Sequence, residues 1–277
     1  MKIGNHDFIK GQRTYIVGIL NVTPDSFYDG GSYTSVEAAV QQARKMVAEG
    51  ADIIEIGGES TRPGHKKMEA EEEIGRVLPV LVELVKEISV PISVDTSKAM
   101  VAKAALEAGA GMINDILSFQ HDPHLAKVCS DFGAVCCTMH NRDNMNYANF
   151  LQDVKDDLNR SIDRLLQAGV KPENIITDPG IGFAKTAQQN LEVLGNLDFF
   201  TSMPYPLMLG TSRKSFMEKT LGFTQDERLE PTISTTVLGI CDGATFIRVH
   251  DVAENKRAAM MADAILKRKG NNEGKHG

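Results

Sequence analysis

Eight short apolar runs recur along the chain of 277 residues, and almost every one ends abruptly in polar or charged residues. The runs are YIVGIL ahead of Asn21, DIIEIG ahead of Glu59, PISV ahead of Asp95, GMI ahead of Asn114, AVCCTM ahead of His140, NIIT ahead of Asp178, PLMLG ahead of Ser212, and TFI ahead of Arg248. Segments with helical spacing of apolar residues lie between them. Buried strands with polar groups at one end predict a (β/α)8 TIM barrel, whose C-terminal face carries the active site.

The length and the linker pattern predict a single domain over residues 1–277. Barrels of this type have roughly 250 residues, and no Pro/Gly/Ser-rich segment divides this chain. Residues 1–12 predict a polar N-terminal hairpin, and residues 270–277 predict a frayed tail. The segments NVTPDSFYDGGSY and GGESTRPGHKKM, after the first two strands, predict two long flexible βα loops that act as lids.

Charge and composition limit the partners of the chain. A net charge of −7 and a pI near 5.5 argue against general nucleic-acid binding. No apolar run approaches the roughly 20 residues of a membrane span, and the N-terminus lacks an apolar signal core, so we expect no membrane partner and a cytoplasmic location. Cys136 and Cys137 are adjacent on a predicted strand and should point to opposite faces. We therefore expect free thiols in a reducing compartment.

The segment RVHDV after the last apolar run predicts an anion site. Arg248 and His250 alternate with Val249, so both side chains can point the same way. The next helix begins at about Asp251, and its free backbone N–H groups add positive potential. The alternative is a surface arginine that pairs with Asp251.

The segment GTSRKSF predicts a second group of ligands at a strand-to-helix turn. Gly210 allows a ligand to approach the backbone closely. Lying beside Arg248, Lys214 is a candidate ligand of a polar oxygen or a ring nitrogen. The alternative for this segment is a solvated helix start.

Three groups at the ends of the middle strands predict a slot for a ring rich in N–H donors. Asp95, Asn114 and Asp178 are costly at an inner barrel mouth unless they are paired or hydrogen-bonded. Asp178 could accept two donors from an amidine-like edge, as in a 2-amino-4-oxo heterocycle, while Asn114 could both donate and accept. Asp178 could instead cap the DPGIG turn. Asp115 more plausibly braces the scaffold.

The histidines give little support for a metal hydrolase. His121 and His124 form an HxxH, but Asp122 and Pro123 between them indicate a helix start. His140 could bind a metal, yet no His-x-His follows the first strand.

Eight motifs in order resemble the dihydropteroate synthase family, in particular its members from Bacillus-like bacteria, and the resemblance runs from about residue 16 to 265. The motifs are GILNVTPDSFYDGG, IIEIGGESTRPG, SVDTSK, INDI, MHNRDNMNY, DPGIGFAK, GTSRKS and RVHDV. The resemblance implies a cytoplasmic homodimeric transferase that makes 7,8-dihydropteroate and diphosphate from 6-hydroxymethyl-7,8-dihydropterin diphosphate and p-aminobenzoate, with Mg²⁺. It also implies a pocket that sulfonamides mimicking p-aminobenzoate can occupy.

The resemblance also implies a role for each matching residue. It assigns the pterin ring to Asp95, Asn114, Asp178 and Lys214, and the diphosphate to Asn21, Thr61, Arg248 and His250, with Asn21 also on Mg²⁺. It assigns the p-aminobenzoate pocket to Phe27, Arg62, Pro63, Phe183 and Ser212, and catalysis to Asp95, Asp178, Lys214 and Arg248.

Two departures from the family pattern and two rival functions remain open from the sequence. Pro231 and Ala184 stand where relatives usually have glycine, and Pro231 bears on helix packing or the dimer contact. A folate-dependent methyltransferase is one rival, although it handles no diphosphate and leaves RVHDV unexplained. A non-catalytic pterin-binding paralogue is the other, although it would not need the intact loop motifs.

Overall fold

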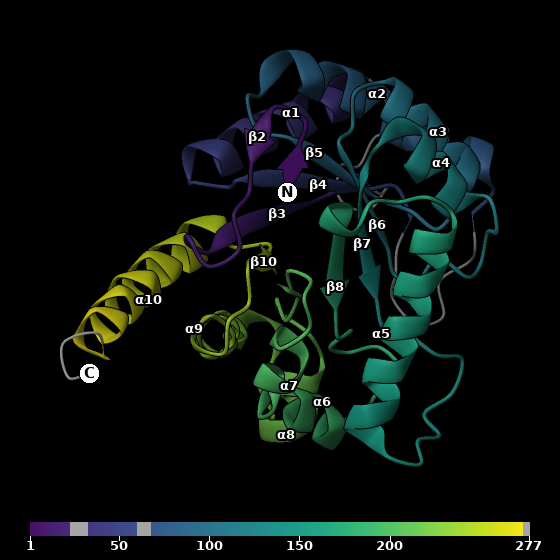
Figure 1. Ribbon diagram of the computed structural model, residues 1–277. Helices are drawn as coiled ribbons and strands as arrows, with labels where there is room; N and C mark the ends of the chain where they lie inside the picture. Colours follow the sequence, from purple (N-terminus) through teal and green to yellow (C-terminus); the bar gives the residue numbers. More distant parts are fainter. Residues whose placement is uncertain (23–32, 60–67, 274–277) are drawn as a thin grey trace.

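The computed structural model describes residues 1–22, 33–59 and 68–273, and it forms a barrel of parallel strands surrounded by helices (Figure 1). The barrel strands are β3 (Tyr15–Asn21), β4 (Ile53–Gly57), β5 (Ile92–Asp95), β6 (Met112–Asp115), β7 (Val135–Met139), β8 (Ile175–Asp178), β9 (Met208–Leu209) and β10 (Phe246–Val249). Their order is β8-β7-β6-β5-β4-β3-β10-β9, with parallel pairing throughout. A parallel bridge from Thr177 to Leu207 joins the two ends. The predicted (β/α)8 barrel is confirmed.

Helices occupy the connections between these strands and pack against the outside of the barrel (Figure 1). They are α1 (Tyr33–Ala48), α2 (Ala70–Glu87), α3 (Ala99–Glu107), α4 (Leu125–Phe132), α5 (Phe150–Gln167), α6 (Ala187–Leu194), α7 (Leu197–Thr201), α8 (Phe216–Leu221), α9 (Leu229–Cys241) and α10 (Val252–Glu273). None of these described helices is both long and apolar enough to cross a bilayer.

Each barrel strand is buried on both faces, which explains its continuous apolar character. Successive side chains point alternately inward and outward. On β7, Val135 and Cys137 join the cluster inside the barrel, whereas Cys136 joins the layer between strands and helices. The prediction that the adjacent cysteines face opposite ways is confirmed, and all four cysteines are free thiols.

The N-terminal hairpin closes the end of the barrel opposite the strand C-termini. It consists of the antiparallel pair β1 (Lys2–Ile3) and β2 (His6–Asp7), as predicted for residues 1–12. The ring of Phe8, which follows β2, lies 4.9 Å from the ring of Tyr15 and 5.8 Å from that of Phe246. Aromatic packing therefore joins the hairpin to the inner face of the barrel.

Two helix ends and one proline bear on the sequence-based expectations. Helix α1 begins at Tyr33, the last residue of the segment that predicts the first lid. Helix α10 continues to Glu273, so it includes residues 270–273 of the expected tail, and no proline interrupts it. Pro231 lies in the first turn of α9, where a backbone N–H has no helical partner, so the helix loses no hydrogen bond.

We predict that Phe8→Ala lowers the free energy of unfolding by about 3–5 kcal/mol, the usual cost of deleting a buried phenylalanine. Phe8 is only 5% exposed, whereas its neighbour Ile9 is 53% exposed. Urea denaturation followed by circular dichroism measures the change. Ile9→Ala is the matched control and should change the free energy by less than about 1 kcal/mol. Equal effects of the two substitutions would contradict an N-terminal hairpin packed into the barrel.

Candidate active site

The strands place a layer of polar side chains directly above the apolar interior of the barrel. Ile53 and Met112 belong to the inner apolar cluster. Two residues further along the same strands, and therefore on the same face, stand Glu55 and Asn114. The alternation that builds the barrel thus also carries polar groups inward at its C-terminal mouth.

Arg248 lies at the centre of this layer and bridges two carboxylates. Its Nε donates to Oε1 of Glu55, and its terminal nitrogen lies 3.2 Å from Oδ2 of Asp95. Burial by itself would lower the pKa of Arg248, but the two carboxylates raise it above its ordinary value. The alternative pairing with Asp251 is wrong, because Asp251 accepts two hydrogen bonds from Arg213, at 2.6 and 2.8 Å.

Glu55 is the site residue that the motif-based assignment missed. Its side chain is 1% exposed, and it also accepts hydrogen bonds from Ser93 Oγ at 3.1 Å and from Asn114 Nδ2 at 3.4 Å. A charge within the apolar run IIEIG was the available signal, because a buried carboxylate needs a cationic or hydrogen-bonding partner.

Asp95 keeps its proton to a higher pH than an ordinary aspartate. Burial, reinforced by the negative charge of Glu55, raises the pKa of Asp95 to about 8, and Arg248 only partly opposes the shift. The protonated acid can donate one hydrogen bond, and the ionised acid only accepts. Asp95 can therefore hold either a donor or an acceptor of a bound ring.

Asn114 and Asp178 present acceptor oxygens near the same space. Asn114 is 4% exposed, and its Oδ1 is buried without a hydrogen-bond partner among the described residues. Oδ1 of Asp178 accepts from the backbone N–H of Gly180 at 2.7 Å, so the turn-capping alternative holds for that oxygen. Burial raises the pKa of Asp178, while the charge of Lys214 opposes that shift. An unpaired buried acceptor is costly unless a ligand donates to it.

Lys214 interacts with the carboxylate of Asp178 and with the aromatic ring of Phe183. Its Nζ donates to the carbonyl oxygen of Ile181 and lies 4.9 Å from the ring centroid of Phe183. Burial lowers the pKa of Lys214 to about 8, and the carboxylate of Asp178 opposes the shift. The predicted residues Lys214, Asp178 and Phe183 are therefore neighbours.

Ser212 and His250, which follow β9 and β10, form a hydrogen-bonded pair. Oγ of Ser212 accepts from the backbone N–H of His250 at 3.1 Å and lies 2.9 Å from its Nδ1. Although part of His250 reaches solvent, burial of the ring, together with the charge of Arg248, lowers its pKa to about 4. At neutral pH His250 can therefore donate a hydrogen bond to an anion but supplies no charge.

The remaining predicted site residues are Asn21 and four residues of the two predicted lids. Asn21 is exposed at the C-terminal end of β3, beside Gly57 of β4. The predicted residues that lie outside the described ranges are Phe27, Thr61, Arg62 and Pro63, together with most of both predicted lids.

Three secondary predictions concern residues beside the site. Asp115 accepts the backbone N–H groups of Leu117 at 2.8 Å and Phe119 at 2.6 Å, which confirms that it braces the scaffold. His121 and His124 are exposed just before α4, as expected for a helix start. His140 is fully buried, and its contacts belong to a cluster described below.

The comparisons with known proteins agree with this geometry. Residues 17–250 match the family model described as "Pterin binding enzyme". The chain is 51% identical to the dihydropteroate synthase of Clostridium beijerinckii, over 97% of this chain and 100% of the relative. It is 48% identical to the dihydropteroate synthase of Bacillus subtilis, over 95% of this chain and 92% of the relative.

The chain belongs to the dihydropteroate synthase family of pterin-binding enzymes. Its fold agrees with a member of that family whose structure is solved, the dihydropteroate synthase of Clostridium difficile crystallised with pteroic acid. The TM-score is 0.91 at 50% identity, over 94% of this chain and 99% of the other. The predicted resemblance to dihydropteroate synthases is confirmed.

We predict that Asp95→Asn stabilises this synthase more at pH 8 than at pH 5. Between an unfolded pKa near 4 and the folded pKa of about 8, the folded state binds the proton more tightly. The free energy of unfolding of the wild type therefore falls as pH rises, by up to about 1.4 kcal/mol per pH unit from this group.

Urea denaturation at both pH values measures the difference between variant and wild type. Asp263→Asn is the control, because Asp263 accepts hydrogen bonds from Thr14, just before β3 and at the opposite end of the barrel from the site. A pH-independent difference for Asp95→Asn would contradict the raised pKa.

Proposed function

We propose that the barrel mouth condenses 6-hydroxymethyl-7,8-dihydropterin diphosphate with p-aminobenzoate to give 7,8-dihydropteroate and diphosphate. The observation that carries the proposal is the inward polar layer, in which acidic and amide oxygens stand beside Arg248 and Lys214. A flat heterocycle rich in N–H donors needs such acceptors, and a diphosphate needs such cations. The related synthase that binds pteroic acid supports the same ligand chemistry.

The pterin ring is assigned to Asp95, Asn114, Asp178 and Lys214. The unpaired Oδ1 of Asn114 supports this assignment, because a ring N–H would relieve the cost of its burial. Protonated Asp95 can donate to a ring nitrogen while Asp178 accepts from the amidine edge. Lys214, next to Asp178, can donate to the ring carbonyl or to a ring nitrogen.

The diphosphate is assigned to Arg248 and His250, with Asn21 and Thr61. Because Glu55 and Asp95 already pair with Arg248, protonation of Asp95 removes one of the two competing negative charges. Neutral His250 donates a hydrogen bond, and the start of α10 adds positive potential.

A magnesium ion fits beside Asn21, next to the proposed diphosphate site. Mg²⁺ is usually held by one or two protein oxygens together with water and substrate phosphates. The exposed amide of Asn21, at the end of β3, can supply one such oxygen. The bound ion would neutralise charge on the departing diphosphate.

The reaction is proposed to be a dissociative substitution. The bond between the pterin methylene carbon and the diphosphate oxygen breaks, and its electron pair leaves with the diphosphate, which Arg248 stabilises. The methylene cation is spread over the dihydropterin, opposite the carboxylate of Asp178. The amine of p-aminobenzoate then attacks the carbon and releases a proton. An aryl amine is already neutral at pH 7, so the attack needs no strong general base.

The p-aminobenzoate pocket is assigned to Phe183 and Ser212, together with Phe27, Arg62 and Pro63 of the loops. The Ser212 hydroxyl can hold the carboxylate of p-aminobenzoate, and the ring of Phe183 borders the path between the two substrates. A methyltransferase would use no diphosphate and would leave the role of Arg248 and His250 unexplained. A non-catalytic binder would have no need of the p-aminobenzoate residues.

We predict that Arg248→Ala lowers kcat/KM by at least about 100-fold, as expected when a group that stabilises developing charge is removed. The assay incubates the protein with the pterin diphosphate, Mg²⁺ and labelled p-aminobenzoate, and measures labelled dihydropteroate. Arg44→Ala, at an exposed arginine of α1 that is paired with Glu87, is the control and should keep full activity. Near-normal synthesis by Arg248→Ala would refute the assignment, and no synthesis by the wild type would refute the function.

The proposed assembly is a homodimer through the late helices. Large apolar side chains are exposed there: Leu238 on α9 is 58% exposed, and Met260, Met261 and Ile265 on α10 are 62%, 65% and 61% exposed. Apolar side chains gathered on two neighbouring helices suit a self-complementary contact.

We predict that the double substitution Met261→Glu and Ile265→Glu converts the dimer to a monomer, because charges buried without partners oppose association. Size-exclusion chromatography with light scattering measures the mass. Met100→Glu, at a residue of α3 that is 55% exposed, is the control and should leave the dimer intact. A dimeric double variant, or a monomeric wild type, would contradict this interface.

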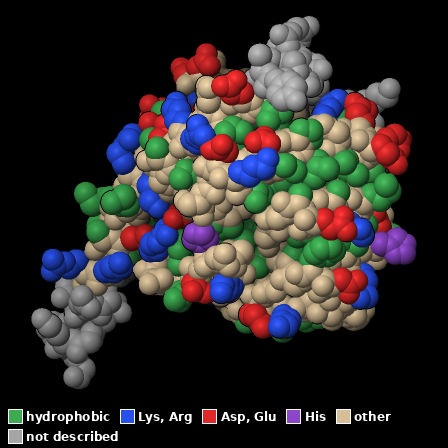
Figure 2. Space-filling view, turned by 90° about the horizontal axis from the view of Figure 1, so that it is seen from above, with side chains coloured by type: hydrophobic (Ala, Val, Ile, Leu, Met, Phe, Trp, Pro, Cys, Tyr) green, Lys and Arg blue, Asp and Glu red, His purple; other side chains and the backbone are tan. Residues whose placement is uncertain are grey.

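The proposed surroundings are the cytoplasm, without a nucleic-acid partner. Figure 2 shows Lys, Arg, Asp and Glu interspersed over the displayed face rather than a continuous basic surface. Free thiols at Cys129, Cys136 and Cys137 suit a reducing compartment.

A further inference from the structure

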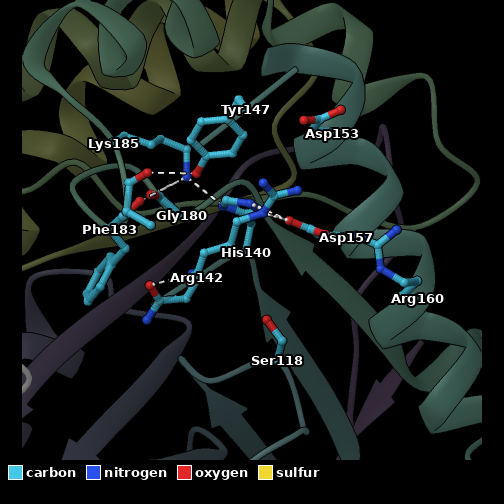
Figure 3. Close-up of polar contacts among 12 residues, drawn as sticks. Ser118, His140, Arg142, Tyr147, Asp153, Asp157, Arg160, Gly180, Phe183 and Lys185 are labelled. Carbon is cyan, nitrogen blue, oxygen red and sulfur yellow. Dashed lines mark hydrogen bonds and ion pairs between the residues drawn. The ribbon is translucent and has the colours of Figure 1, made fainter. Parts of the chain in front are cut away.

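A buried lysine beside the site has three hydrogen-bond acceptors. Lys185 is only 8% exposed, and lysine is almost never buried without partners. Its Nζ lies 2.7 Å from Nδ1 of His140, 3.0 Å from the carbonyl oxygen of Gly180 and 3.1 Å from that of Phe183. Figure 3 shows these contacts converging on Nζ. An ammonium group has three N–H donors, so its donors match the three acceptors.

His140 connects Lys185 to helix α5. Its Nε2 lies 3.1 Å from Oδ2 of Asp157, so the ring proton belongs on Nε2 and the Nδ1 lone pair accepts from Lys185. Burial, together with the charges of Lys185 and Arg142, lowers the pKa of His140 to about 2. The ring therefore stays neutral. Asp157 is held in turn by ion pairs with Arg142 and Arg160.

Tyr147 holds the turn that follows β8, residues 180–185, which also carries Lys185. Its hydroxyl donates to the carbonyl oxygen of Ala184 at 2.7 Å, and the guanidinium of Arg142 lies 4.5 Å from its ring centroid. Ala184 has a φ of 46°, a left-handed conformation that is unfavourable for a residue with a Cβ. Tyr147, in the loop after β7, thus holds the turn at the carbonyl of residue 184, while Lys185 of the turn itself donates to the carbonyls of residues 180 and 183.

This turn carries groups that belong to both proposed substrate sites. The N–H of Gly180 holds Asp178, and a Cβ at Gly180 would lie 2.0 Å from the carbonyl oxygen of His140, so the turn packs tightly on β7. The ring of Phe183 points away from Lys185 in Figure 3 and lies beside Lys214. A shift of the turn would therefore move Phe183 relative to Asp178, the carboxylate that is proposed to bind the pterin ring.

We propose that Lys185 is a positioning residue for the aryl-amine substrate: by tying the carbonyls of Gly180 and Phe183 to His140, it fixes the ring of Phe183 at the entrance for p-aminobenzoate. The inference rests on the proposed function, which assigns Phe183 to that pocket. Lys185 touches neither substrate and acts through the backbone of the turn.

The positioning contact should respond to pH near neutrality. Burial lowers the pKa of Lys185 to about 7, although Asp178 favours its charged form. The titratable groups that face it are His140 at the end of β7, Arg142 in the following loop, Asp157 of α5, Asp178 at the end of β8, and Lys214 before α8. As pH rises through 7, the neutral amine keeps only two donors for three acceptors. The KM for p-aminobenzoate should therefore rise on the alkaline side.

We expect Lys185→Met to raise the KM for p-aminobenzoate at least about tenfold, because a small misplacement of a binding group has a large kinetic cost. The KM for the pterin diphosphate should rise by a clearly smaller factor, because Asp178 is also fixed by strand β8, and the alkaline rise in the KM for p-aminobenzoate should disappear. Lys127→Met, at an exposed lysine of α4, is the control and should match the wild type. Equal changes in both KM values, or none, would overturn the proposal.

Tyr147→Phe provides a second test that removes only the hydroxyl bonded to Ala184. It should raise the KM for p-aminobenzoate in the same direction, and its effect should not add to that of Lys185→Met, because both act on one turn. If Lys185→Met fails to fold, Tyr147→Phe still tests the anchored turn. An unchanged KM in a folded Tyr147→Phe variant would then count against the proposal.

Hydrogen exchange separates this inference from the proposed function. Amides of residues 180–184 in the substrate-free protein should exchange faster in Lys185→Met and above pH 7, after correction for intrinsic exchange rates. Unchanged exchange would overturn the positioning role even in an active synthase. Synthesis of dihydropteroate by the wild type tests the function separately.

Discussion

The ion pairs of Arg248 with Glu55 and Asp95 are the constraint on which the site depends. These residues come from β10, β4 and β5, so the pairs join strands from both ends of the sequence across the barrel interior. A guanidinium buried there requires carboxylates, and the carboxylates require it. Burial and the negative charge of Glu55 raise the pKa of Asp95 to about 8, and the guanidinium of Arg248 only partly opposes that shift.

The barrel makes this arrangement possible through the alternation of its strands. Met112 fills the interior, while Asn114, two residues later on the same face, enters the site. The apolar layer and the N-terminal hairpin close one end of the barrel, so polar groups can accumulate only at the other. Hydrophobic packing and ligand chemistry are thus separated along the barrel axis rather than between domains.

A second level of organisation lies behind the residues proposed to bind substrate. Lys185 and Tyr147 hold the backbone of one turn, and that turn supports Asp178 and Phe183. The position of His140 at a strand end suggests a metal ligand. In the structure, however, both ring nitrogens contact protein side chains, so His140 belongs to this supporting layer. Precise placement of a small aromatic acid needs this supporting layer, because the backbone of a turn is otherwise free to shift.

The sequence by itself determined the barrel and its mouth, because strands buried on both faces must be apolar and must end where polar residues begin. It also determined the family, because eight ordered motifs carried the resemblance, and it identified Asp95, Asn114, Asp178 and Lys214 as candidates. Only the tertiary structure decided which side chains pair with one another. Arg248 lies three residues from Asp251 yet pairs with Glu55, which is 193 positions away. Hydrogen bonds and ion pairs depend on distances of a few ångströms across the closed barrel, and linear spacing does not encode those distances.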